Sequence, residues 1–322
     1  MNPLFTALQT PVVSPRFSAQ VSKNKSLLRG VSRILGNTPS ALLAKEILPA
    51  LTIEKDVALK FHTNAMTTLS SCSNALHVKF SANKNLNLDG IAISSGDKPL
   101  AERKIVVYFL PNYMLWEEKI EDFLAFSDRL EADVVCYNYR GCGQSSGFPN
   151  DANDLVADGL SQLQQLLDAG AKPENIVLYG YSLGGGISMQ VAEALAKANI
   201  PVNIVNERSF SSIDAVLKTT KVFGERIAAQ AIKSLGWNLS SETALQELHG
   251  NVLIIDNPHD EVIEAAASLR SALDSKSYPN KDKIHVITMK KTKTEDQHDR
   301  AWTKAETEAI FQAISKLWTK KP

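Results

Sequence analysis

The chain has 322 residues, 44% of them hydrophobic and 22% charged, which suits one large globular domain with an extension, or two small domains. Its 35 basic and 35 acidic side chains balance, and no Lys/Arg-rich block appears, so a nucleic acid is not the expected partner. No apolar run approaches the ~20 residues of a membrane span and no secretory signal is recognisable, which favours a cytoplasmic protein. The three cysteines, Cys72, Cys136 and Cys142, cannot all pair within one chain and agree with a reducing compartment.

The first 45 residues carry six basic side chains and no acidic one. Residues 27–35 place apolar side chains at helical spacing with the basic ones largely off that face, so we predict a short basic amphipathic helix that ends at Gly36. Three interpretations stay open: an extension packed on the main domain, a segment attracted to an anionic membrane surface, and an acid-poor targeting peptide. A second helical piece at about residues 40–53 should bend or end at Pro49.

From about residue 75 the pattern changes to strands. Two short runs, 75–81 and 86–95, predict a hairpin that leads into the main sheet. From residue 104 strands and helices alternate, which indicates an α/β fold with a mostly parallel, doubly wound sheet covered on both faces. We expect strands near residues 104–110, 133–139, 175–180, 202–206, 251–256 and 283–289, and helices near residues 116–130, 152–169, 187–199, 260–275 and 301–318.

The alternation is interrupted between residues 209 and 250, where helical pieces include 222–235. Because this interval lies between two strands of the sheet, we predict a small helical cap rather than a separate domain. The expected division is therefore an N-terminal basic, helical extension at residues 1–74 and one α/β domain at residues 75–322. Apolar cap residues are candidates for a substrate-facing wall: Val222, Phe223, Ile227, Ile232, Leu235 and Trp237.

A buried strand, a glycine-rich turn and a helix follow one another from residue 175 to residue 199. The strand ends in an apolar and aromatic run, and the turn reads Gly-Tyr-Ser-Leu-Gly. Such a turn holds Ser182 at a strained corner, because its two glycines let neighbouring backbone pass close to it. The N–H of Leu183, at the start of the helix, would then meet an oxyanion formed beside Ser182. The alternatives are a turn chosen for its geometry alone and a phosphate-binding turn.

A serine hydroxyl needs a base that takes its proton and a carboxylate that orients the base. Asp260 is the candidate acid, because it follows shortly after a buried strand, and Asp256 at the end of that strand is its competitor. Alternatively, Asp260 caps a helix that begins at Glu261. His298 is the candidate base, because it lies in the loop after the last long strand. Among the other histidines we expect His285 to be a core residue of that strand, and we find no metal-ligand spacing.

This order of serine, acid and histidine resembles the triad of the α/β-hydrolase superfamily. A second motif, Tyr-Asn-Tyr-Arg-Gly-Cys-Gly-Gln-Ser-Ser-Gly at residues 137–147, is similar to a structural turn near the site of many serine hydrolases, and Asp158 matches their following helix. The likeness covers roughly residues 75–318. It is greatest to the small-capped esterases and thioesterases, a branch that includes protein depalmitoylases and monoacylglycerol lipases.

Residues 207–212, Glu-Arg-Ser-Phe-Ser-Ser, also resemble a segment of hydrolases from intracellular bacteria, among them secreted effectors of the Sid/Sdb type. This second likeness implies export by a non-classical route as an alternative to a cytoplasmic location.

The chain departs from the family pattern near the expected oxyanion hole. Members usually carry His-Gly after the third strand, whereas this chain has Leu-Pro-Asn-Tyr at residues 110–113. The proline has no N–H, so the resemblance leaves Asn112 or Tyr113 to complete the hole. The usual His-Gly before the acid is Asp-Asn here, ending at Asn257, and the usual glycine before the histidine is Gln297.

The triad and the resemblance imply a serine hydrolase that cleaves a carboxylic ester or thioester and requires no metal or organic cofactor. The substrate is expected to be a small molecule or a lipid acyl group. The apolar cap and the basic N-terminal helix favour a lipid-like acyl group, and this helix makes a membrane surface a candidate partner. Two other functions stay open. The altered oxyanion segment suits a catalytically inactive binding module of the same fold, and a peptidase could use the same triad.

Overall fold

The computed structural model describes residues 2–9, 38–83, 85–219 and 225–319. The basic amphipathic helix predicted at residues 27–35 lies outside these ranges. Within them, every helix falls short of the length and apolar character that a membrane crossing needs.

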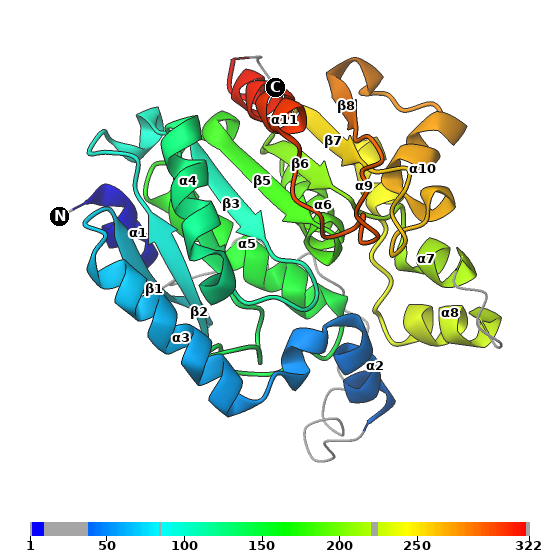
Figure 1. The fold of residues 1–322 in the computed structure, drawn as a ribbon, viewed down its shortest axis with the longest axis horizontal. Helices are drawn as coiled ribbons and strands as arrows, with labels where there is room; N and C mark the ends of the chain where they lie inside the picture. Colours follow the sequence, from blue (N-terminus) through cyan, green and yellow to red (C-terminus); the bar gives the residue numbers. More distant parts are fainter. Residues whose placement is uncertain (1, 10–37, 84, 220–224, 320–322) are drawn as a thin grey trace.

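An eight-stranded sheet forms the centre of the molecule, with the order β1-β2-β4-β3-β5-β6-β7-β8 (Figure 1). The hairpin β1–β2 and the pair β2–β4 are antiparallel, and all other neighbours are parallel. The strands are β1 Ala75–Asn83, β2 Leu86–Ile93, β3 Ile105–Phe109, β4 Asp133–Tyr137, β5 Ile176–Tyr181, β6 Asn203–Glu207, β7 Val252–Asp256 and β8 Ile284–Thr288. The predicted mostly parallel sheet is thus confirmed, with small shifts at the strand ends.

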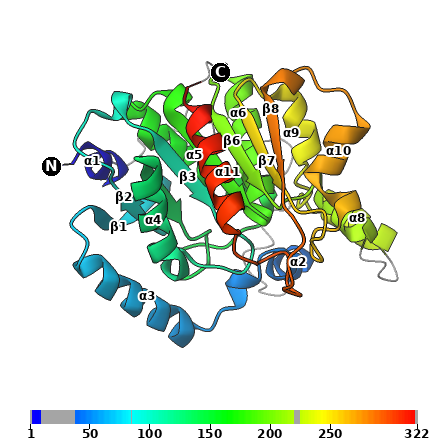
Figure 2. The same cartoon turned by 45° about the horizontal axis from the view of Figure 1, so that its top comes forward.

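Helices cover both faces of this sheet. Helices α4 (Ile120–Leu130) and α11 (Lys304–Leu317) lie on one face, and α5 (Ala152–Asp168) and α6 (Leu183–Lys197) lie on the other (Figures 1 and 2). Strands β4, β5, β6 and β7 are buried along their whole length, which explains why their sequences are apolar runs without alternation. Parallel strands place their carboxyl ends at one edge of the sheet, so the turns after β3, β5, β6 and β7 gather there.

The edge strand β8 is an exception to this burial. Its residues are half-buried or exposed, and His285 is exposed rather than part of the core. The prediction for His285 was wrong because an edge strand has only one neighbour and little cover. The helix expected at residues 260–275 also begins later, with a short 3-10 turn, η5, at Ala265–Ala267 and α10 at Leu269–Ser275.

Helices α1 (Pro3–Gln9) and α3 (Lys55–Ser70) of the N-terminal part pack on the α/β sheet. Helix α1 contacts β1 and α5, and α2 (Pro39–Ile47) ends just before the 3-10 turn η1 (Pro49–Thr52), which confirms the break at Pro49. Helix α3 was not predicted from the sequence. It lies against β1 and against η3 (Trp116–Lys119), on the same side as α4 (Figures 1 and 2).

The interval between β6 and β7 is helical, as expected, and holds α7 (Ile213–Thr219), α8 (Glu225–Ser234) and α9 (Ser241–Glu247). Helix α9 packs on α6, and the Trp237 Nε1–H donates to Ser40 Oγ in α2 at 3.2 Å. Of the predicted wall residues, Ile232 and Trp237 are buried in the core and Leu235 packs against it. Val222, Phe223 and the side chain of Ile227 lie outside what the structure describes.

Candidate active site

Ser182 occupies a sharp corner between β5 and α6. Its φ of 53° and ψ of −118° place a non-glycine residue in a strained conformation, which persists only where the surroundings hold it. The Ser182 N–H donates to the Glu207 carbonyl at 3.0 Å, and α6 begins directly at Leu183, earlier than predicted. A Cβ on Gly184 would lie 2.1 Å from the Phe109 carbonyl oxygen, so only glycine lets the start of α6 approach the end of β3 this closely.

The structure brings the three predicted triad residues into one chain of hydrogen bonds. His298 Nε2 lies 3.0 Å from Ser182 Oγ, and His298 Nδ1 lies 2.6 Å from Asp260 Oδ2. All three side chains belong to buried residues, with exposed fractions of 6% for Ser182, 2% for His298 and 7% for Asp260. An acid that binds Nδ1 fixes the ring tautomer in which Nε2 can accept the serine proton.

Asp260 reaches His298 from a turn rather than from a helix cap. Its Oδ1 accepts the N–H groups of Val262 and Ile263 at 2.9 and 2.7 Å, which leaves Oδ2 for the histidine. The helix that Asp260 was expected to cap at Glu261 is absent from this part of the described chain. Asp260, and not its competitor Asp256, therefore faces the imidazole.

Three residues that the sequence reasoning did not assign hold His298 in place. The Tyr181 ring stacks on the imidazole with a centroid distance of 5.5 Å, and its hydroxyl donates to the His298 carbonyl at 2.8 Å. The Arg208 guanidinium donates to the His298 and Arg300 carbonyls and lies 4.7 Å from the centre of the Tyr181 ring. Glu207, which pairs with Arg208, also accepts from Trp302 Nε1 at 2.8 Å, so the end of β6 anchors His298 and the chain that follows it.

Glu261 supports the same loop from the acid side. Its carboxylate accepts the N–H groups of Gln297 at 2.9 Å and His298 at 3.2 Å. Although desolvation alone would raise the pKa of Glu261, these two N–H donors hold it below the ordinary value for glutamate. The only sequence signal for this role was its position directly after Asp260.

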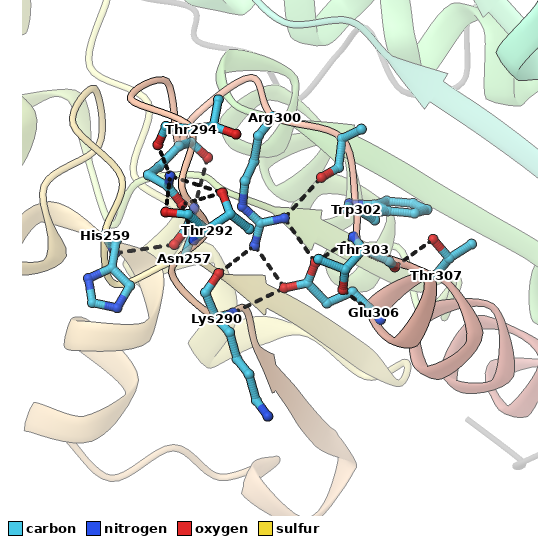
Figure 3. Close-up of polar contacts among 12 residues, drawn as sticks. Asn257, His259, Lys290, Thr292, Thr294, Arg300, Trp302, Thr303, Glu306 and Thr307 are labelled. Carbon is cyan, nitrogen blue, oxygen red and sulfur yellow. Dashed lines mark hydrogen bonds and ion pairs between the residues drawn. The ribbon is translucent and has the colours of Figure 1, made fainter.

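Glu306 closes the base of the loop that carries His298 (Figure 3). Its carboxylate binds the Arg300 guanidinium through both oxygens, at 2.9 and 2.7 Å, and accepts the N–H groups of Lys290 at 3.0 Å and Thr303 at 2.8 Å. Desolvation would raise its pKa, but these donors outweigh it and lower the pKa of Glu306 to about 2. One charged group therefore ties the start and the end of the loop together.

Two departures from the family pattern contact each other. The Asn257 side chain donates to the Gln297 carbonyl at 2.8 Å, and its oxygen accepts the N–H of His259 at 3.2 Å (Figure 3). The Gln297 side chain is buried and bonds to Thr292 and Thr294 within the same loop. At the two positions where the family pattern has glycine, the side-chain amides of Asn257 and Gln297 thus hold the loop through hydrogen bonds.

The segment after β3, which includes the predicted oxyanion residues Asn112 and Tyr113, is held by two hydrogen bonds. The Tyr139 hydroxyl donates to the Leu110 carbonyl at 2.8 Å, and the Ala50 N–H from η1 donates to the Asn112 carbonyl at 3.1 Å. Among the described residues, the N–H groups of Leu183, Asn112 and Tyr113 donate to no other protein group. The hydroxyl of Tyr113 bonds to Asp299, and desolvation together with this acidic neighbour raises the pKa of Tyr113 above its ordinary value.

The glycine-rich turn after β4 is held by ion pairs at the start of α5. Arg140 donates to both oxygens of Asp158, with Nε at 2.7 Å and Nη2 at 2.5 Å, and its Nη1 lies 3.0 Å from Asp154. These ion pairs explain why the turn motif, which contains Arg140, occurs together with Asp158. The motif takes no part in the hydrogen bonds between Ser182, His298 and Asp260.

A cavity of about 420 Å³ lies between α4, α11 and the sheet, behind the histidine loop. Aromatic side chains from these elements line it, together with Tyr113, Tyr181, Arg208 and Asp299. Neither Ser182 nor His298 belongs to its lining. A molecule in this cavity would contact the residues that hold His298 rather than the serine itself.

Comparison with known proteins places the chain in a family. The model of the Chlamydia CHLPS protein family (DUF818) matches residues 70–315. The chain belongs to this family. A crystal structure of an alpha-beta hydrolase from Vibrio vulnificus superposes with a TM-score of 0.64 over 86% of this chain and 92% of that one, at 19% identity. The Pyrococcus furiosus esterase Pf2001 gives a TM-score of 0.55 over 76% and 91%, at 14% identity. The predicted α/β-hydrolase fold is thereby confirmed.

Sequence relatives cover smaller parts of the chain. The chain is 25% identical over 193 residues to a multifunctional-autoprocessing repeats-in-toxin protein of Vibrio cholerae, which is 59% of this chain and 4% of the toxin. It is 25% identical to Schizosaccharomyces pombe protein bem46 over 55% of this chain and 58% of that protein. Human alpha/beta hydrolase domain-containing protein 17C is 27% identical over 46% and 41%. The chain thus spans less than two thirds of the length of each of these relatives.

Proposed function

We propose that the protein is a serine hydrolase that cleaves a carboxylic ester or thioester, with Ser182 as nucleophile, His298 as general base and acid, and Asp260 as the orienting carboxylate. The observation that carries the proposal is the continuous chain of hydrogen bonds from Asp260 through His298 to Ser182, at a serine with φ of 53°. The esterases among the proteins with this fold are consistent with it.

In this mechanism Ser182 Oγ attacks the acyl carbonyl carbon while His298 Nε2 takes its proton. The N–H of Leu183, with that of Asn112 or Tyr113, stabilises the negative charge on the tetrahedral oxygen. His298 then protonates the leaving alcohol or thiol, and an acyl-enzyme remains on Ser182. Water, deprotonated by His298, attacks the acyl carbon and releases the acid, so the enzyme returns to its starting state.

A lipid-like acyl group remains a proposal from the sequence alone, because Ile232, Leu235 and Trp237 of the cap interval pack in or against the core. The cavity behind the histidine loop does not support it, because its lining lacks the nucleophile. A series of p-nitrophenyl esters from short to long acyl chains tests this point. Turnover that rises with chain length supports a lipid-like substrate, and a preference for acetyl esters contradicts it.

Labelling with a fluorophosphonate probe tests the activated serine. Wild type should label, whereas Ser182→Ala and His298→Ala should not. Ser275→Ala changes an exposed serine at the end of α10 and serves as the matched control. Ester turnover should fall by about 10³-fold or more in the two triad variants. A wild-type protein that is folded but neither labels nor turns over would refute the proposal and favour a binding module.

A further inference from the structure

A cluster of four ligand-type side chains lies away from the triad, where three parts of the chain meet. His62 comes from α3, His77 from β1, Asp89 from β2 and Glu117 from η3. One nitrogen of His62, one of His77 and one carboxylate oxygen of Asp89 all lie within 4.8 Å of one another. The sequence showed no ligand spacing because His62 stands on a helix that was not predicted, and the other groups converge only through strand pairing.

The separations between these atoms are close to those of a metal site. His77 Nε2 lies 2.6 Å from Asp89 Oδ1, and His62 Nδ1 lies 3.1 Å from Glu117 Oε1 and 3.9 Å from Asp89 Oδ2. Ligands at about 2.0–2.1 Å from a tetrahedral Zn²⁺ are roughly 3.3 Å apart. The atoms of His62, His77 and Asp89 therefore lie close enough to share one ion, and Glu117 adjoins them through its contact with His62.

The charges of the cluster favour a divalent cation. The side chains of Asp89 and Glu117 are 1% and 0% exposed, and carboxylates at such positions are costly without a compensating charge. In the part of the chain that the structure describes, no lysine or arginine forms an ion pair with either carboxylate. Two carboxylates and two neutral imidazoles around one Zn²⁺ would have no net charge.

Neighbouring groups already orient both carboxylates. Trp116 Nε1 donates to Asp89 Oδ2 at 2.9 Å, and Asn138 Nδ2 donates to Glu117 Oε2 at 2.9 Å. The Trp116 N–H in turn donates to Asn138 Oδ1 at 2.9 Å, which links the two donors. Each carboxylate thus has one oxygen fixed by an N–H donor and the other oxygen directed at a histidine, an arrangement typical of metal ligands.

We propose that His62, His77, Asp89 and Glu117 bind one Zn²⁺ ion. Imidazole and carboxylate ligands in this number suit zinc, and the site would be structural because four protein ligands leave no open position. The histidine side chains are 18% and 20% exposed, so an ion can enter from the solvent side. The ion would join α3 of the N-terminal extension to the β1–β2 hairpin and to η3.

Metal binding to the chelator-treated full chain tests the proposal. Calorimetry with Zn²⁺ should give one ion per chain, and Co²⁺ should produce the visible absorption of a four-coordinate N/O site. His62→Gln and His77→Gln should each lower the affinity by about 100-fold or more, whereas Trp116→Phe, which loses only an orienting donor, should lower it about 10-fold. His285→Gln removes an exposed histidine of the edge strand and should leave binding unchanged.

Thermal unfolding separates zinc binding from simple pairing of protonated histidines with the carboxylates. Zn²⁺ should raise the unfolding midpoint of wild type and of His285→Gln, and should not raise that of His77→Gln. Absence of one-to-one binding in folded wild type overturns the proposal. So does an affinity that both histidine variants retain, because the ion would then be held elsewhere, for example at Cys72. If the histidine variants do not fold, unchanged affinity in Trp116→Phe overturns it.

Discussion

Replacing Glu306 by glutamine tests how the loop that carries His298 is held. All four groups that approach the carboxylate are donors: two guanidinium N–H groups of Arg300 and the backbone N–H groups of Lys290 and Thr303. A glutamine amide would turn its own N–H groups toward two of these donors. The variant should therefore lose both the charge and half of the hydrogen bonds, while the size of the side chain is kept.

The magnitude follows from the pKa of Glu306. Its lowering from 4.5 to about 2 corresponds to about 3 kcal/mol of folding free energy at neutral pH. A lowered folded-state pKa gives stability that is fully present above the unfolded-state value and is lost as the pH falls toward the folded-state value. The difference between wild type and Glu306→Gln should therefore decrease from about 3 kcal/mol at pH 7 to about 2 kcal/mol near pH 3.5.

Urea unfolding at several pH values measures this difference. Glu308→Gln is the matched control, because Glu308 lies on the same helix and pairs with Arg129 at the surface, where a salt bridge contributes at most about 1 kcal/mol. A difference below about 1 kcal/mol at pH 7, or one that grows as the pH falls, would contradict a stabilising role of the Glu306 charge. In that case the loop would be held by contacts other than the Glu306 charge.

Three further substitutions test other parts of the site. Asp260→Asn should lower ester kcat by about 10³- to 10⁴-fold because the imidazole loses its orienting acceptor, and a fall below 10-fold would contradict its role. Arg208→Lys should lower kcat by about 10²-fold, since one ammonium cannot hold both loop carbonyls, and unchanged turnover would refute this. Gly184→Ala should destabilise the fold by about 1–3 kcal/mol or more in urea unfolding, because its Cβ would meet the Phe109 carbonyl oxygen at 2.1 Å, and wild-type stability would contradict that contact.

The central sheet could be predicted because each strand is encoded locally. Buried parallel strands appear in the sequence as short apolar runs. The run before Ser182 is accompanied by glycines at positions where a tight turn leaves no room for a side chain. Elements with mixed patterns were harder. Helix α3 has many polar residues and a weak apolar face, so its packing on β1 was not visible, and His285 was assigned to the core because a strand pattern does not reveal an edge.

The order of the candidate triad residues along the chain could be predicted from local sequence patterns: a serine corner, then an acid after a strand, then a histidine in a late loop. Short-range patterns suffice for this, because turns and strands depend on neighbouring residues. That Asp260 rather than Asp256 faces His298, and that Arg208 and Glu306 hold the histidine loop, follows from contacts formed in the folded chain. These contacts join segments far apart in the chain, and their directions depend on loop conformation and packing, which no local pattern contains.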